Sequence, residues 1–192
     1  MFSQENQLDK YKYISYLIGS MEETAEGDGG ESKRTVIERE LLSRGVFAIN
    51  PVTLEKSKTG MGVDKAKEFM DLCIKNKDFS TFKKTSREIW KGIDKYDAKH
   101  GLIHIPGDVD YVTMSDFITC LFQEGDKPCG TFMEVGIALE HDIPVYLLTN
   151  CDIEKIKKSF LQGIFASGGA VFNDMGTYLN FLENEYNLTK GK

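Results

Sequence analysis

At the centre of the sequence stands Gly130-Thr131-Phe132-Met133-Glu134-Val135-Gly136-Ile137-Ala138. An apolar run over residues 116–122 precedes it, and a second apolar run over residues 143–149 follows it. The order predicts strand, loop, helix and strand, with Glu134 in the first turn of the helix beside the carboxyl end of a buried strand. Open parallel sheets bind their ligands at that edge.

Two interpretations of Glu134 follow from this placement. In the first, Thr131 and Glu134 form a capping box, in which the threonine accepts a hydrogen bond from an amide at the helix start and the glutamate reaches back. In the second, the helix start keeps the carboxylate ionised and Gly130 lets the backbone approach a ligand closely. An ionised carboxylate in a cleft is a competent nucleophile.

Further strands and helices extend in both directions from this segment. Aromatic and β-branched residues predict a strand over 13–18 that stops at Gly19, and short strands are expected over 46–49, 145–149 and 168–172. Helical spacing predicts helices between 32 and 45, over 153–161 and over 175–186. Alternation of strands with helices predicts a parallel sheet with helices on both faces.

Residues 54–100 are rich in lysine and carry apolar residues at helical spacing. We expect a helical insertion between strands, with a second helix over about 82–96, because two such helices cannot bury a core alone. The prediction is one domain over 1–192 with a Rossmann-like or flavodoxin-like three-layer α/β sandwich and a mostly parallel five-stranded sheet.

Composition limits the classes of partner. The net charge of −6 disfavours duplex nucleic acid, whereas a small nucleotide needs only the backbone amides of a helix start. The chain has no run of about 20 apolar residues and no basic-then-apolar leader, so we expect no membrane and a cytoplasmic location. The widely spaced cysteines predict reduced thiols and neither a disulfide framework nor a zinc site.

Several of these motifs, taken in order, resemble the nucleoside 2-deoxyribosyltransferase superfamily, which includes 2'-deoxynucleoside 5'-phosphate N-hydrolases. The resemblance lies in the turn Gly19-Ser20-Met21, an acidic glycine-rich loop, the residues Asp110, Ser115 and Asp116, the segment from Gly130 to Ala138, and Pro144. It implies cleavage or transfer at the N-glycosidic bond of a nucleoside or nucleoside 5'-monophosphate, without a cofactor. It also implies a homo-oligomer in which neighbouring subunits complete each other's pockets.

The resemblance assigns roles to particular residues. Glu134 matches the glutamate that attacks the anomeric carbon, and Asp116 resembles the aspartate that protonates or orients the leaving base. The residues expected to bind the substrate are Gly19, Ser20, Met21, Asp28, Asp126, Gly130 and Thr131. For Ser20, Asp28 and Asp116, capping or solvation is the competing interpretation.

Two further functional interpretations remain open from the sequence. A glycohydrolase acting on NAD or a phosphoribohydrolase is the second enzymatic option, because its glycine-rich motif partly overlaps Gly130, Thr131 and Glu134. A nucleotide-binding module without turnover is the non-enzymatic one. Lys33 and Arg34 are expected on a solvated helix face, with contact to a 5'-phosphate as the alternative interpretation. No metal is expected at His100 and His104, because Gly101 and Pro106 disfavour a helix there.

Overall fold

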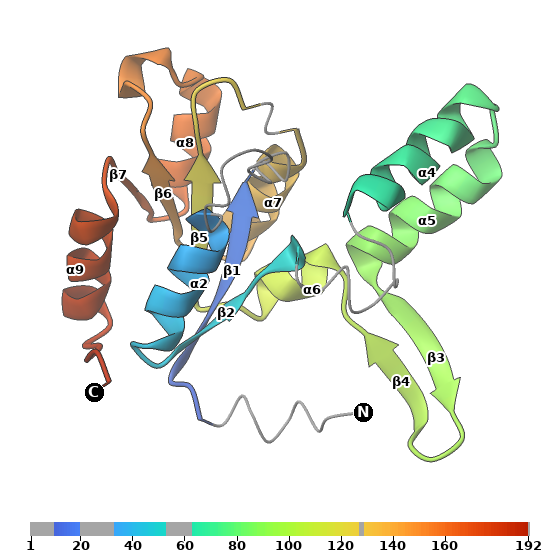
Figure 1. The fold of residues 1–192 in the computed structure, drawn as a ribbon, viewed down its shortest axis with the longest axis horizontal. Coiled ribbons are helices and arrows are strands. Elements are labelled where there is room, and N and C mark those ends of the chain that lie inside the picture. Colours follow the sequence, from blue (N-terminus) through green and yellow to red (C-terminus); the bar gives the residue numbers. More distant parts are fainter. Residues whose placement is uncertain (1–9, 20–32, 53–62, 127–128, 192) are drawn as a thin grey trace. The chain divides into compact units, whose positions relative to one another are not determined.

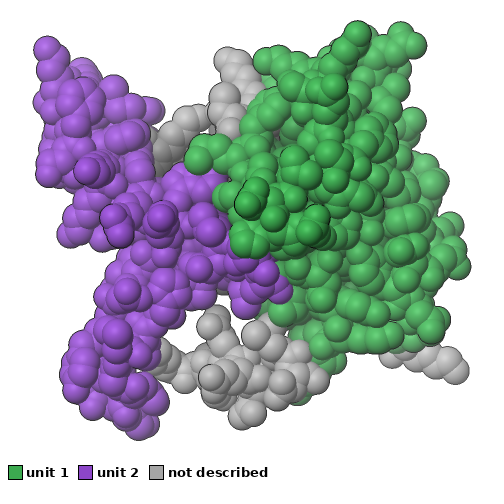
Figure 2. Space-filling view, turned by 180° about the vertical axis from the view of Figure 1, so that it is seen from behind, with its two compact units in different colours: residues 1–51, 115–192 green, residues 52–114 purple. Residues whose placement is uncertain are grey.

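The computed structural model describes residues 10–19, 33–52, 63–126 and 129–191. The chain divides into two compact units, one of residues 1–51 and 115–192 and the other of residues 52–114 (Figure 2). The second unit includes the predicted insertion and extends beyond it to residue 114. Within the described residues, no helix is long and apolar enough to cross a membrane.

The first unit is built on a five-stranded parallel sheet, as predicted. In spatial order its strands are β2 (Val46–Ile49), β1 (Tyr13–Gly19), β5 (Phe117–Phe122), β6 (Val145–Thr149) and β7 (Ala170–Phe172) (Figure 1). The strands consist almost entirely of β-branched, aromatic and other apolar residues, as is typical of strands covered on both faces. The fold is a three-layer α/β sandwich of the flavodoxin-like strand order.

Helices cover both faces of this sheet (Figure 1). On one face, α2 (Lys33–Leu42) and α9 (Met175–Glu185) share a core with side chains of β1 and β5 such as Leu17 and Phe117. On the other face lie α7 (Cys129–Glu140) and α8 (Lys158–Ala166), which follows the short 3-10 turn η1 (Ile153–Lys155). The alternation of side chains along each strand therefore sends neighbouring residues to different helices.

A chain of buried hydroxyl groups crosses the first face. The Ser15 hydroxyl on β1 lies 2.8 Å from that of Thr119 on β5, and the Thr119 hydroxyl lies 2.6 Å from that of Tyr178 on α9. All three side chains are buried, and each hydroxyl group has a hydrogen-bond partner within this row of three. Burial of a hydroxyl group without a hydrogen-bond partner would cost free energy, so these hydrogen bonds favour one alignment of β1, β5 and α9.

The second unit contains α4 (Val63–Lys75), α5 (Phe79–Lys91), the antiparallel strands β3 (Ile93–Asp97) and β4 (Gly101–Ile105), and α6 (Asp108–Thr113). The expected helix over about 82–96 is therefore wrong beyond Lys91, and the insertion is not purely helical. Gly92 has a φ of 72°, which ends the helix, and Asp97 accepts hydrogen bonds from the amides of Lys99 and His100 to form the hairpin turn.

Candidate functional site

The strand order reverses between β1 and β5, since β2 lies outside β1 and the later strands extend from β5. Ligands of doubly wound α/β folds bind at the carboxyl ends of the two strands that flank such a point. In this chain those ends are Gly19 and Phe122, and α7 follows β5 through the loop at the same edge. The candidate site is therefore this edge of the sheet.

Gly19 brings the two strands into close contact there. Its φ is 131°, and a Cβ atom at this position would lie 2.0 Å from the carbonyl oxygen of Leu121. Only glycine fits this position, so the packing of the two strands is enough to explain why residue 19 is a glycine. A role of Gly19 in lining a substrate pocket stays a prediction.

Arg34 joins the site from the start of α2. Its guanidinium donates to the carbonyl oxygens of Leu17 at 2.7 Å and of Gly19 at 2.8 Å, and only 6% of the residue is exposed. The expectation of a solvated face is thus wrong for Arg34, while Lys33 is exposed. Arg34 can face the sheet although its neighbour Lys33 is exposed, because successive side chains on a helix are about 100° apart.

Glu134 lies in the second turn of α7, because this helix begins at Cys129. Thr131 is inside the helix and is not its N-cap, so the predicted capping box is wrong. Thr131, Glu134, Val135 and Ala138 are all buried, and their spacing places them on the face of α7 that packs on the sheet. Only 9% of Glu134 is exposed, so its side chain belongs to this buried face.

Several charged side chains act on the thiol of Cys120, a buried residue of β5. Burial raises the pKa of its thiol, and the negative charge of Glu134 raises it further. Arg34 acts on the same thiol in the opposite direction, and Asp126 acts in the same direction as Glu134. Glu134, Arg34 and Asp126 therefore lie close enough to Cys120 to influence its charge, and the thiol itself stays neutral.

Asp126 is fixed by a tight turn after β5. Its backbone amide donates to the Gln123 carbonyl at 3.2 Å, and its Oδ2 accepts from the Gln123 amide at 2.8 Å. Gly125, with a φ of 97°, occupies the third position of this turn, where a positive φ is required. The turn holds the Asp126 carboxylate at the carboxyl edge of the sheet.

Asp116 lies at the other edge. It precedes β5 and is exposed, and its Oδ2 accepts from the backbone amide of Ile14 at 2.7 Å, near the start of β1. A strand of six residues rises about 3.3 Å per residue, so most of the length of β5 separates Asp116 from Phe122. The structure therefore does not bring Asp116 together with Asp126 at the carboxyl edge.

The other predicted binding residues divide into two groups. Ser20, Met21 and Asp28 lie outside the described residues. Gly130 is an exposed residue of α7, and no described atom lies within 4 Å of the position its Cβ would take. Packing among the described residues thus gives no reason for a glycine at position 130.

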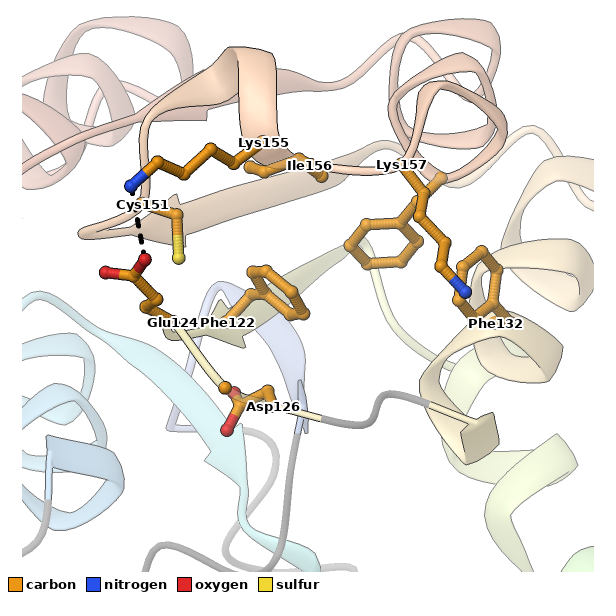
Figure 3. A pocket seen from close by; sticks show the side chains of 10 residues that line it. Phe122, Glu124, Asp126, Phe132, Cys151, Lys155, Ile156 and Lys157 are labelled. Carbon is orange, nitrogen blue, oxygen red and sulfur yellow. Dashed lines mark hydrogen bonds and ion pairs between the residues drawn. The ribbon is translucent and has the colours of Figure 1, made fainter.

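A cavity of about 470 Å³ opens beside Asp126, at the carboxyl ends of β5 and β6 (Figure 3). Its wall is formed by Phe122, Phe132 and Phe160, and Asp126 and Lys157 belong to its lining. We did not predict this cavity from the sequence. Its aromatic residues come from three separate elements, and in the sequence each resembles an ordinary core residue.

The histidines of the second unit are engaged with carboxylates. His104 Nδ1 lies 2.6 Å from Asp94 and its Nε2 lies 3.0 Å from Asp110, while His100 Nδ1 lies 2.9 Å from Asp97. These pairs raise the pKa of His104, with the Asp110 hydrogen bond as the largest cause. Among the described residues, no group of three or more ligating side chains is arranged to hold a metal ion.

Neither a protein-family model nor a curated protein sequence matches the chain. One similar solved structure is that of a CMP N-glycosidase, BcmB, from Clostridium botulinum. The match has a TM-score of 0.46 and 15% identity, and covers 90% of this chain and 98% of that one. We draw no conclusion about this chain from a likeness at that level.

Proposed function

We propose that the chain cleaves the N-glycosidic bond of a nucleoside or nucleoside 5'-monophosphate, with Glu134 as the nucleophile. The observation that carries the proposal is the position of Glu134. It is a buried residue on the inner face of α7, beside the point where the strand order reverses. The resemblance of its motif to the deoxyribosyltransferases agrees with this role.

The reaction uses the carboxylate in two steps. A Glu134 oxygen attacks the anomeric carbon as the bond from that carbon to the base nitrogen breaks, which gives a glycosyl ester and a free base. Water, or a second base, then attacks the same carbon and releases Glu134 as a carboxylate. The leaving nitrogen of the base is protonated in the first step, and the incoming water or second base is deprotonated in the second step.

Asp126 is better placed than Asp116 to handle that proton. Asp126 lies at the carboxyl edge and its charge reaches Cys120 together with that of Glu134, whereas Asp116 lies at the start of β5. A carboxyl group within reach of the leaving nitrogen acts as a general acid in the first step and a general base in the second. We therefore assign this role to Asp126.

Arg34 supplies positive charge to the same region. Its buried guanidinium is fixed on the carbonyl oxygens of Leu17 and Gly19, and its charge opposes that of Glu134 at Cys120. A nearby cation favours the ionised form of a carboxylate, which is the nucleophilic form. Arg34 thus acts through Glu134 as a positioning residue.

The test is release of free base from a panel of deoxynucleosides, ribonucleosides, their 5'-monophosphates and NAD, followed by chromatography. We expect base release from at least one nucleoside or monophosphate, reduced about 10³-fold or more in Glu134→Gln. Glu140→Gln is the matched control, because Glu140 lies on the exposed end of the same helix. Full activity in Glu134→Gln would exclude the nucleophile.

The same panel separates the alternatives. Release of nicotinamide from NAD alone would indicate a glycohydrolase for that dinucleotide, and release of base only from ribonucleoside 5'-monophosphates would indicate a phosphoribohydrolase. Binding of nucleotides in a thermal-shift assay without any base release would indicate a binding module. Adding a second base to an active reaction distinguishes transfer from hydrolysis, since transfer yields a new nucleoside.

A further inference from the structure

The cavity beside Asp126 has the properties of a site for a planar ring. The rings of Phe132 and Phe160 have centroids 4.8 Å apart, and those of Phe122 and Phe160 are 5.8 Å apart, each pair tilted by about 50° to 60°. Phe160 lies between the other two and is 1% exposed, so the three rings form a continuous aromatic wall. A volume of about 470 Å³ is typical of small-molecule sites.

The charged groups around the cavity are not equivalent. The Lys155 ammonium lies 3.2 Å from Glu124 and 3.8 Å from Asp152, so these charges largely satisfy one another. By contrast, the Lys157 ammonium forms no ion pair with any residue that the structure describes, and its side chain belongs to the cavity lining (Figure 3). Among the described residues that line it, the cavity therefore presents one available cation, that of Lys157, beside an aromatic wall.

A lysine ammonium donates hydrogen bonds and accepts none. The ammonium can therefore donate a hydrogen bond to an oxo group of a heteroaromatic ring, but it forms no hydrogen bond with an amino group, which is itself a donor. The carboxylates that would favour an amino group are engaged, Glu124 by Lys155 and one oxygen of Asp126 by the Gln123 amide. Negative charge that develops on a leaving base also concentrates on its oxo groups, and Lys157 would stabilise it.

We propose that this cavity holds the leaving base and that Lys157 selects an oxo-substituted base, such as hypoxanthine or uracil, over its amino counterpart, adenine or cytosine. The assignment of the ring as a leaving base rests on the proposed function. Asp126 connects the two parts of the site, because it lines the cavity and its charge acts on Cys120 together with that of Glu134. Binding of the free base itself does not require turnover.

Calorimetric titration with free hypoxanthine, adenine, uracil and cytosine tests the proposal on the intact chain. We expect each oxo base to bind about tenfold more tightly than its amino counterpart, because a hydrogen bond to a charged donor is a strong one. Lys157→Met should remove this difference. Lys158→Met, a change at an exposed neighbour that does not line the cavity, should keep it.

The aromatic wall has its own matched pair. Phe132→Leu keeps an apolar side chain but removes a stacking surface, so all four bases should bind about fivefold to tenfold more weakly. Phe165→Leu changes an exposed phenylalanine on α8 outside the cavity and should leave binding unchanged. Both variants should be folded, which their unfolding temperatures will show.

The outcomes separate this proposal from the cleavage reaction. If base is released from nucleosides while Lys157→Met and Phe132→Leu bind every free base like the wild type, the cavity is not the base site. If oxo bases bind with the expected dependence on Lys157 but no substrate is cleaved, the cavity assignment is supported as a ligand site and the proposed catalysis is wrong. An unchanged preference in Lys157→Met would overturn the selectivity assignment.

Discussion

Gly19 and Leu121 approach each other so closely that a Cβ atom at position 19 would lie 2.0 Å from the Leu121 carbonyl oxygen. The contact joins the carboxyl ends of β1 and β5, the two strands between which the order of the sheet reverses. Backbone atoms of a central strand cannot move aside without breaking the hydrogen bonds of the sheet. The geometry of the candidate site therefore depends on a residue that has no side chain.

Gly19→Ala should destabilise the protein strongly. The methyl group would overlap a carbonyl oxygen, and the φ of 131° is unfavourable for alanine, so we expect a loss of about 3 kcal/mol or more in the free energy of unfolding. Urea denaturation measures it. Gly136→Ala, at an exposed helical position with open space, is the control and should not destabilise. A loss below about 1 kcal/mol in Gly19→Ala would contradict the close contact.

Gly130→Ala should affect stability and catalysis in opposite directions. Alanine is a better helix former than glycine and meets no described atom within 4 Å, so the free energy of unfolding should rise by about 0.5 kcal/mol. If the substrate approaches this backbone, the added methyl group should raise KM several-fold. Steady-state kinetics of base release, with Gly136→Ala as reference, provide the measurement. An unchanged KM would mean that position 130 does not face the substrate.

Asp126→Asn and Asp116→Ala should have different effects. Loss of the proton-transfer group should lower turnover in Asp126→Asn by about 10²-fold, while the isosteric amide keeps an oxygen that accepts from the Gln123 amide. Asp116→Ala removes the hydrogen bond to the Ile14 amide, so it should cost about 1 kcal/mol of stability and leave turnover within about threefold. The reverse result would restore Asp116 as the acid.

The second unit should lose stability as the pH rises. Asp110 and Asp94 both bind His104 and raise its folded-state pKa above the ordinary value of 6.5, so the protonated ring stabilises the folded state. This contribution is complete below pH 6.5 and is lost as the pH rises through the higher folded-state pKa. The protection factors of the β3 and β4 amides in hydrogen exchange should therefore fall over that interval. In His104→Gln the same step should be absent, and a step that persists would point to another group.

The sequence predicted the sheet well because each of its strands is a short apolar run that ends at a clear signal, such as Gly19 or the pair Asn50-Pro51. It did not predict β3, the first strand of the β3–β4 hairpin. Ile93–Asp97 carries two aspartates and a lysine, and the strand is largely exposed, so its composition lacks the usual strand pattern.

The candidate site could be predicted only in part. Resemblance, not periodicity, pointed to Glu134. The predicted helix start, with Thr131 as N-cap, was three residues late and created a capping box at a position that lies inside the helix. The position of Asp116 was predictable, since a residue before a strand lies at its amino end and not at the ligand-binding edge. The cavity was not predictable, because Phe122, Phe132 and Phe160 meet only through tertiary packing.

The buried hydroxyl chain from Ser15 through Thr119 to Tyr178 bears on how the protein is made. A ribosome releases β1 and β5 long before it releases α9, so the Thr119 hydroxyl waits for one of its two partners until the last helix emerges. Slippage of β1 by one residue along β5 would turn Ser15 away from Thr119 and leave polar groups buried without partners. Arrival of Tyr178 therefore favours the correct pairing of two strands that were synthesised much earlier.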